Sequence, residues 1–151
     1  MPLLRREELL SLFRRVIPFP GCTAGIVGYG AFGRLVADCA RESSCRVLLN
    51  DPPLEREASS EIFDAFQEQW GNGMGRCDYS DTLTETFLPL ETLIKECDIL
   101  SIQVPGTEEN HSLISPRLFA RLKPHALILN FSSFKVVPLQ EKRVLFLGEE
   151  A

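Results

Sequence analysis

A glycine-rich turn between an apolar run and a helical pattern constrains the fold of this chain more than any other feature. Residues 24–27 are apolar and lead directly into Gly28, Gly30 and Gly33, which have the spacing G-x-G-x-x-G. A helical pattern follows at once, with apolar side chains on one face at Leu35, Val36, Cys39 and Ala40. A strand, a glycine turn and a helix in this order predict a turn that binds the pyrophosphate of a dinucleotide.

Each glycine has a distinct physical role in that prediction. Gly28 allows the tight turn out of the strand, and Gly30, which lacks a Cβ atom, lets a pyrophosphate approach the backbone. Gly33 allows the helix to pack closely against the strand. The first N–H groups of the helix then offer unpaired donors and a partial positive charge to the phosphates.

A second feature supports the same prediction at the end of the next apolar run. Residues 45–50 are predicted to form a strand that ends at Asp51, 18 positions after Gly33 and close to the ~20 expected of the acidic residue that binds the adenosine ribose. A carboxylate there accepts hydrogen bonds from both ribose hydroxyls and repels a 2′-phosphate, which favours NAD over NADP. Arg56 follows two prolines and is a weaker candidate for a phosphate contact. The alternative is an ordinary turn followed by an Asp that caps a helix.

The rest of the chain alternates short apolar runs with helical patterns. Further strands are predicted over residues 99–104 and 126–130, with a strand-sized apolar run at 143–147, and helices over 3–17, 55–70, 89–96 and from Pro116. This alternation is typical of a buried parallel sheet. The predicted fold class is therefore α/β, a Rossmann-type doubly wound parallel sheet in three α/β/α layers. We expect residues 1–20 to form an N-terminal helix and linker, and residues 21–151 to form an NAD-binding domain.

A second glycine-rich run, at residues 71–75, has a different expected role. It lacks a preceding strand and the Lys-Ser/Thr that would follow in a phosphate-binding loop, so it is predicted to be a surface loop. The polar and acidic residues 76–86 are predicted to form an irregular excursion.

Charge and cysteine content narrow the classes of partner. The net charge of −5 argues against a nucleic-acid-binding surface, and no apolar run approaches the length of a membrane span. The cysteine count of 5 is odd, and no two have C-x-x-C spacing. With only 2 histidines, a zinc site is not expected. Free thiols in a reducing cytoplasm fit this composition best, and an organelle transit peptide is the less favoured alternative for the arginine-rich start.

Several strings, in order, resemble the D-isomer-specific 2-hydroxyacid dehydrogenases. Residues 25–33 resemble the cofactor loop of this family, and residues 105–114 and 122–130 resemble two of its later segments. The double proline of Asp51-Pro52-Pro53 is most similar to the erythronate-4-phosphate dehydrogenase-like members. The resemblance implies hydride transfer between a 2-hydroxy acid and NAD, and a homodimer formed through this domain. It also implies a substrate-binding arginine and a histidine–carboxylate pair as general acid and base.

The chain departs from the family where catalysis would occur. Ser133 stands where the resemblance places the arginine, and Lys135 could supply a charge there only if the loop were remodelled. The family's Glu and His would lie in a segment that this chain does not possess. The substrate domain that the resemblance implies is also missing, so residues 21–151 are expected to be a C-terminally truncated NAD-binding domain. His111 and His125 have no evident carboxylate partner and are predicted to be surface histidines. No catalytic residue is therefore assigned.

Three functional hypotheses remain open from the sequence. The first is the cofactor domain of a 2-hydroxyacid dehydrogenase, binding NAD without turnover as these residues alone. The second is a stand-alone dinucleotide sensor or interaction module, and the third is a related domain that binds nothing. For the first two, the residues expected to contact the dinucleotide are Gly28, Tyr29, Gly30, Ala31, Phe32, Gly33, Asp51, Pro52, Val104, Pro105, Asn110 and Asn130.

Overall fold

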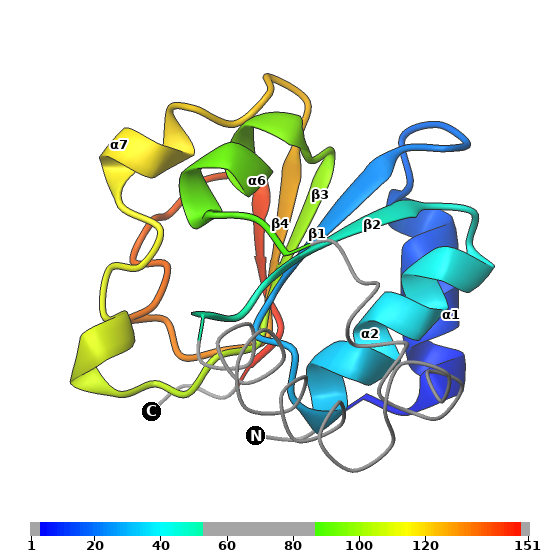
Figure 1. Ribbon diagram of the computed structural model, residues 1–151, viewed down its shortest axis with the longest axis horizontal. Helices are drawn as coiled ribbons and strands as arrows, with labels where there is room; N and C mark the ends of the chain where they lie inside the picture. The colour runs from blue at the N-terminus through cyan, green and yellow to red at the C-terminus, as the bar shows by residue number, and fades with distance from the viewer. Residues whose placement is uncertain (1–3, 53–86, 149–151) are drawn as a thin grey trace, which may run out of the picture.

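Five parallel strands form a single sheet in the described part of the chain, in the order β2-β1-β3-β4-β5. The computed structural model describes residues 4–52 and 87–148. The strands are β1 (Thr23–Val27), β2 (Arg46–Asn50), β3 (Ile99–Ile102), β4 (Leu127–Asn130) and β5 (Val144–Phe146). The chain therefore starts near the centre of the sheet, moves outward to β2, crosses back over β1 and continues to β5 (Figure 1).

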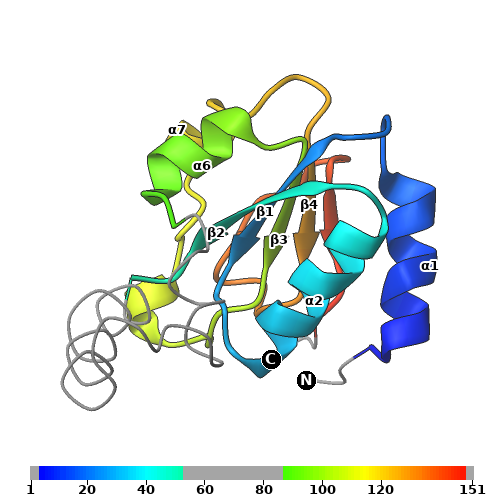
Figure 2. The ribbon, with the colours of Figure 1, turned by 45° about the vertical axis from the view of Figure 1, so that its right-hand side comes forward.

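Helices cover both faces of the sheet, because alternate strand residues point to opposite sides. On one face, Ala24 and Ile26 of β1 share a core with α1 (Arg6–Val16) and α2 (Ala31–Glu42). On the other face, Val27 shares a core with α6 (Leu90–Glu96) and α7 (Pro116–Phe119). Figure 2 shows α1 and α2 together on one side of the sheet and α6 on the other. The predicted three-layer α/β/α architecture and parallel sheet are confirmed.

Most predicted elements are present, with shorter bounds. The strand expected over residues 99–104 ends at Ile102, and the helix that begins at Pro116 ends at Phe119. The predicted N-terminal helix is present and buries Leu9 and Phe13. The domain division at residue 20 stays a prediction. The helix expected over residues 55–70, the loop at 71–75 and the excursion at 76–86 lie outside the described residues. After that gap the chain returns beside β2, where Phe87 forms an isolated parallel bridge with Leu49.

Gly25 has a packing role that its place in an apolar run did not reveal. A Cβ atom at this position of β1 would collide with the Leu93 side chain and lie 3.3 Å from the Cβ of Cys97. Leu93 belongs to α6 and is fully buried. The missing side chain therefore lets α6 approach the centre of the sheet closely.

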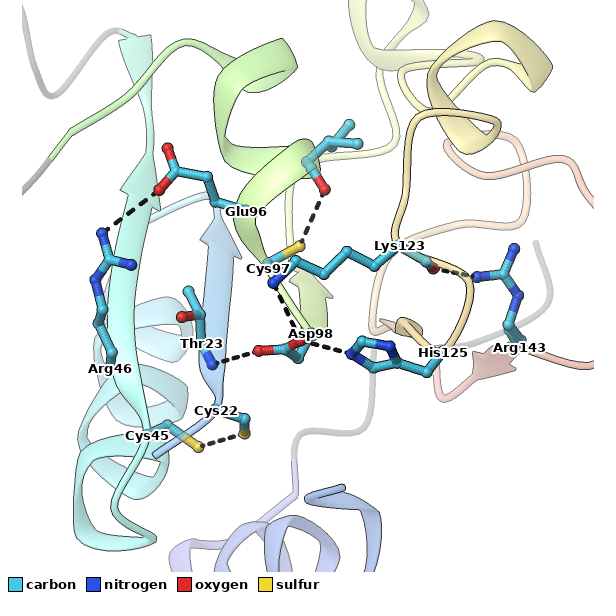
Figure 3. Close-up of polar contacts among 11 residues, drawn as sticks. Cys22, Thr23, Cys45, Arg46, Glu96, Cys97, Asp98, Lys123, His125 and Arg143 are labelled. Atoms are coloured by element: carbon cyan, nitrogen blue, oxygen red, sulfur yellow. Dashed lines mark hydrogen bonds and ion pairs between the residues drawn. The ribbon is translucent and has the colours of Figure 1, made fainter. Parts of the chain in front are cut away.

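The amino edge of the sheet is held by a buried carboxylate, that of Asp98 (Figure 3). One oxygen accepts a hydrogen bond from the Thr23 backbone N–H at 2.8 Å. The other lies 2.6 Å from His125 Nε2 and 3.3 Å from Lys123 Nζ. The carboxylate thereby joins the starts of β1, β3 and β4. The prediction that His125 has no carboxylate partner is wrong, because the turn before β4 brings it against a residue 27 positions away.

The pKa of the Asp98 carboxyl reflects this environment. Burial alone would raise that pKa, but the hydrogen bonds from Thr23, His125 and Lys123, with the nearby Lys123 charge, lower it below its ordinary value. The ionised form is thus the one that the folded chain stabilises.

The described cysteines are buried thiols without disulfides: Cys22, Cys39, Cys45 and Cys97. Burial raises the pKa of Cys45 and of Cys97 to about 12. Cys77 lies outside the described residues. Within residues 4–52 and 87–148, no helix is long and apolar enough to cross a membrane, and no group of three or more potential ligands could hold a metal ion.

Substituting Asp98 tests the contribution of this anchor. Asp98→Asn keeps an oxygen acceptor for the Thr23 N–H but removes the charge that Lys123 and His125 contact. We expect a loss of about 2 kcal/mol at neutral pH, because hydrogen bonds to charged groups contribute ~1.5–3 kcal/mol. Since the pKa of Asp98 is lowered on folding, wild-type stability from this group is present above the unfolded pKa of about 3.9 and is lost as the pH falls through the folded pKa.

Urea unfolding across the acid range measures both effects. Asp98→Asn should flatten the acid side of the stability curve relative to wild type. Asp38→Asn is the control, because Asp38 forms an exposed pair with Arg41, and such pairs contribute less than ~1 kcal/mol. Equal losses in the two variants would contradict the anchoring role of Asp98.

Candidate dinucleotide-binding site

The predicted cofactor residues lie along the carboxyl edge of the sheet, at the bottom of Figure 1. There β1 ends at Val27, the glycine turn follows, and α2 begins at Ala31. Gly28 has a φ of +96°, which side chains rarely adopt, and a Cβ atom there would lie 2.6 Å from the Gln103 carbonyl oxygen. Only glycine fits this turn without strain.

Gly30 and Gly33 differ in what surrounds them. A Cβ atom at Gly33 would collide with the Gly28 carbonyl oxygen, so glycine is required there for α2 to pack against the turn. Among residues 4–52 and 87–148, a Cβ atom at Gly30 would meet no atom within 4 Å. The fold therefore does not require glycine at position 30, and the open space beside it is where the sequence prediction places the pyrophosphate.

Asp51 is fixed directly beside the turn. Its Oδ2 accepts a hydrogen bond from the Tyr29 N–H at 2.7 Å. The neighbouring Gly28 N–H donates to the Asn50 carbonyl at 2.8 Å. These bonds hold the end of β2 against the glycine turn, so the acidic group and the turn come together as predicted. Pro52 follows at an exposed position.

The side chain of Gln103 crosses the base of the turn, a role that sequence reasoning missed. Its Nε2 donates to the carbonyl oxygens of Val27 and Gly28, at 2.7 and 3.0 Å. Its Oε1 accepts from Ser101 Oγ at 2.7 Å. The residue type shows that a glutamine side chain can both donate and accept hydrogen bonds. No local pattern, however, indicates that this one contacts a turn 75 positions earlier in the chain.

The loops after β3 and β4 are tied together by Ser132. Its Oγ accepts from the Val104 N–H at 2.8 Å and donates to the Val104 carbonyl at 2.9 Å. Asn110 donates from Nδ2 to the Pro105 carbonyl at 2.9 Å, which closes the loop that follows β3. Val104, Pro105 and Asn110 are thus brought together, and Ser132 is a second positioning residue that the sequence did not single out.

Asn130 lies at the same edge but is fully buried. Its Oδ1 accepts from the Ser132 N–H at 2.9 Å, and its Nδ2 donates to the Ser133 carbonyl at 3.3 Å. The amide therefore shapes the loop after β4. A direct contact between Asn130 and a cofactor stays a prediction.

Aromatic packing joins the first helix of the site to the last loop. The Phe32 ring meets the Phe131 ring edge-on, with centroids 5.1 Å apart.

The loop after β3 also passes close to Ser133. A Cβ atom built on Gly106 would lie only 3.1 Å from the Cβ of Ser133. Ser133 Oγ accepts from the Lys135 N–H at 3.2 Å. The position where an arginine was expected is thus occupied by a small side chain held within its own loop.

These residues fit a dinucleotide. The space at Gly30 admits a group close to the backbone, and the first turn of α2 presents N–H groups that a helix leaves unpaired. The Asp51 carboxylate stands at the end of the neighbouring strand, as a ribose-binding group must. When NAD is bound, its nicotinamide supplies the hydride chemistry.

Comparisons with known proteins agree with this geometry. The family model described as D-isomer specific 2-hydroxyacid dehydrogenase, NAD binding domain, matches residues 73–140. A glyoxylate reductase from Korarchaeum cryptofilum is 33% identical over 117 residues, which are 78% of this chain and 29% of that protein. An erythronate-4-phosphate dehydrogenase from Bacteroides fragilis is 30% identical over 119 residues, which are 76% of this chain and 27% of that protein. The chain thus spans less than a third of the length of these relatives.

Solved structures share the fold. The structure of D-lactate dehydrogenase from Aquifex aeolicus, complexed with NAD and lactic acid, has a TM-score of 0.55 at 21% identity, over 89% of this chain and 37% of that one. That likeness concerns the arrangement of strands and helices. The sequence matches carry the assignment further: the chain contains the NAD-binding domain of the D-isomer-specific 2-hydroxyacid dehydrogenase family.

Proposed function

We propose that this chain binds NAD(H) across the carboxyl edge of its sheet, with the adenosine ribose on Asp51 and the pyrophosphate at Gly30. The observation that carries the proposal is the hydrogen bond of 2.7 Å from the Tyr29 N–H to Asp51. It fixes a carboxylate at the side of the glycine turn, where it can accept bonds from ribose hydroxyls. A carboxylate in this position also repels a 2′-phosphate, so the proposed cofactor is NAD and not NADP.

The remaining site residues have separate proposed roles. The backbone at Tyr29, Ala31 and Phe32 lines the approach to the phosphates, together with the three glycines. Pro52 borders the ribose, and Val104, Pro105 and Asn110 border the nicotinamide half. Asn130 supports that half through the loop it holds.

The activity proposed for the whole protein is oxidation or reduction at the CH–OH group of a 2-hydroxy acid. This proposal rests on the family and on relatives named glyoxylate reductase and erythronate-4-phosphate dehydrogenase. Residues outside the cofactor domain of those longer proteins would bind the substrate. For residues 1–151 alone we propose cofactor binding without turnover.

One observation favours a second candidate, a non-catalytic dinucleotide sensor or interaction module. Ser133 cannot hold a substrate carboxylate in a charge-assisted pair of hydrogen bonds, as an arginine does. Its close packing against Gly106 leaves the loop compact. In this candidate the chain binds NAD(H) at the same residues and transmits occupancy to a partner.

Two measurements test binding and turnover separately. Calorimetric titration with NADH tests binding. Absorbance at the NADH band tests turnover, with glyoxylate added to NADH, and with D-lactate or D-glycerate added to NAD⁺. Binding without turnover is the result expected for both candidates, whereas turnover would contradict the non-catalytic role proposed for residues 1–151. No heat and no thermal stabilisation at millimolar NADH would reject both the cofactor domain and the sensor.

Two further properties of the protein are proposed. We propose a homodimer through this domain by analogy with the family, which sedimentation analysis tests. We also propose a cytoplasmic location, supported by the odd cysteine count and the absence of C-x-x-C spacing.

Replacing Asp51 tests the ribose assignment. Asp51→Ala removes the acceptor for the ribose hydroxyls, and we expect NADH binding to weaken by ~1.5–3 kcal/mol, the contribution of hydrogen bonds to a charged group. Asp51→Asn should weaken binding less and relax the discrimination against NADPH. Calorimetry with both nucleotides measures the change, and NADH binding equal to wild type in Asp51→Ala would show that the ribose lies elsewhere.

Two glycine substitutions separate folding from binding. Gly33→Ala should cost ~2–3 kcal/mol of folding stability, because its Cβ collides with a backbone carbonyl. Gly30→Ala should cost less than ~1 kcal/mol of stability, since the position caps α2 and the added Cβ meets no atom of the described residues. It should nevertheless weaken NADH binding strongly. Urea unfolding and calorimetry on both variants provide the test, and normal NADH affinity in Gly30→Ala would remove the pyrophosphate from that position.

A further inference from the structure

Arg34 places a positive charge beside the glycine turn, and the proposed function has not used it. The residue lies in the first turns of α2, where its backbone N–H donates to the Gly30 carbonyl at 2.9 Å. Its side chain folds back over the turn, and the guanidinium carbon lies 4.5 Å from the centroid of the Tyr29 ring. The charge is therefore held in a defined place even though the residue is exposed.

The contacts of the Tyr29 ring show that the Arg34 guanidinium lies on the side of the glycine turn that faces the end of β2. Its ring is nearly buried and meets the Phe87 ring edge-on, with centroids 6.2 Å apart. Phe87 in turn bridges to Leu49 of β2. Since Tyr29 also donates its N–H to Asp51, the ring, the end of β2 and the proposed ribose-binding carboxylate lie together. The guanidinium on that ring belongs to the same side, where the adenylate half of a dinucleotide would bind.

The charge of Arg34 is not neutralised within the described residues. Two other arginines of α1 and α2 do form ion pairs, Arg6 with Glu42 and Arg41 with Asp38. No carboxylate in residues 4–52 or 87–148 pairs with Arg34, whose recorded contact is the aromatic ring. A guanidinium that stacks on a ring keeps its N–H donors in its own plane, where they can bind a phosphate bidentately.

We propose that Arg34 binds the phosphate of the adenylate half of the dinucleotide, so that this half is held by a carboxylate on its ribose and a guanidinium on its phosphate. The inference rests on the proposed function and adds a positioning residue to the same site. The stack on Tyr29 pre-orients the guanidinium, which lowers the entropy lost when the phosphate binds. If the stack served only to stabilise the fold, Arg34 would have no effect on ligand affinity.

The test compares four ligands with four forms of the protein by calorimetry. The forms are wild type, Arg34→Gln, Arg34→Lys and the control Arg41→Gln, which removes a positive charge from the last turn of the same helix. The ligands are NADH, ADP, AMP and adenosine. We expect Arg34→Gln to weaken NADH, ADP and AMP binding roughly tenfold, as loss of a charge-assisted hydrogen bond does, and to leave adenosine binding unchanged. Arg34→Lys should restore part of the loss, because it keeps the charge without the planar fork, and Arg41→Gln should bind all four ligands as wild type does.

Salt dependence and thermal unfolding make the outcome specific. The affinity of wild type for AMP should fall more steeply with KCl concentration than that of Arg34→Gln, since only wild type pairs the phosphate with this charge. Melting curves without ligand identify any loss of folded protein. Equal NADH affinity in wild type and Arg34→Gln overturns the inference while leaving the proposed function intact. The inference is also overturned if Arg34→Gln weakens adenosine binding as much as AMP binding, which would place the guanidinium on the base. Absence of NADH binding to wild type rejects the proposed function itself.

Discussion

The close passage of the chain at Gly28 and Gly33 is the constraint on which the rest of the site depends. The carbonyl of Gly28 occupies the space that a side chain at Gly33 would need, and the backbone of Gln103 occupies the space beside Gly28. Three segments therefore pass very close to one another: the glycine turn after β1, the start of α2 and the residues that follow β3. This contact sets the angle at which α2 leaves the sheet, and so where its first N–H groups and Arg34 lie.

The two edges of the sheet use polar groups in opposite ways. At the amino edge, the Asp98 carboxylate contacts a backbone N–H, a lysine and a histidine of its own chain, which makes it part of the fold. At the carboxyl edge, Asp51 accepts a hydrogen bond from the Tyr29 N–H of the glycine turn, and the next residue of that turn, Gly30, faces space that none of the described residues fills. Buried polar groups that are satisfied internally hold a structure together. A turn without a side chain beside such space lets a ligand approach the backbone.

Local sequence patterns were enough to predict the strands, the glycine turn and the acidic residue Asp51 beside it. Each is set by spacing over a few residues or by the length of one strand–helix unit, as with Gly28, Gly33 and Asp51. The contacts that the sequence did not reveal join loops far apart in the chain. Gln103 reaches the turn, Ser132 ties the loops after β3 and β4, and His125 meets Asp98, because the order β2-β1-β3-β4-β5 aligns strand ends that no periodicity relates. Gly25 was likewise hidden, since its role depends on where α6 packs.

The bridge between Leu49 and Phe87 has a consequence for the edge of the sheet. The Leu88 N–H donates to the Leu49 carbonyl at 2.8 Å, and Asn50 Nδ2 donates to the Leu88 carbonyl at 2.8 Å. The chain that departs after β2 is thus pinned on its return next to its point of departure. These bonds are made at Leu49 and Asn50, directly before Asp51, so they steady the end of the strand that carries the proposed ribose-binding group. Since β2 is the first strand in the order, the returning segment also covers backbone groups at an edge of the sheet that would otherwise be open to another strand.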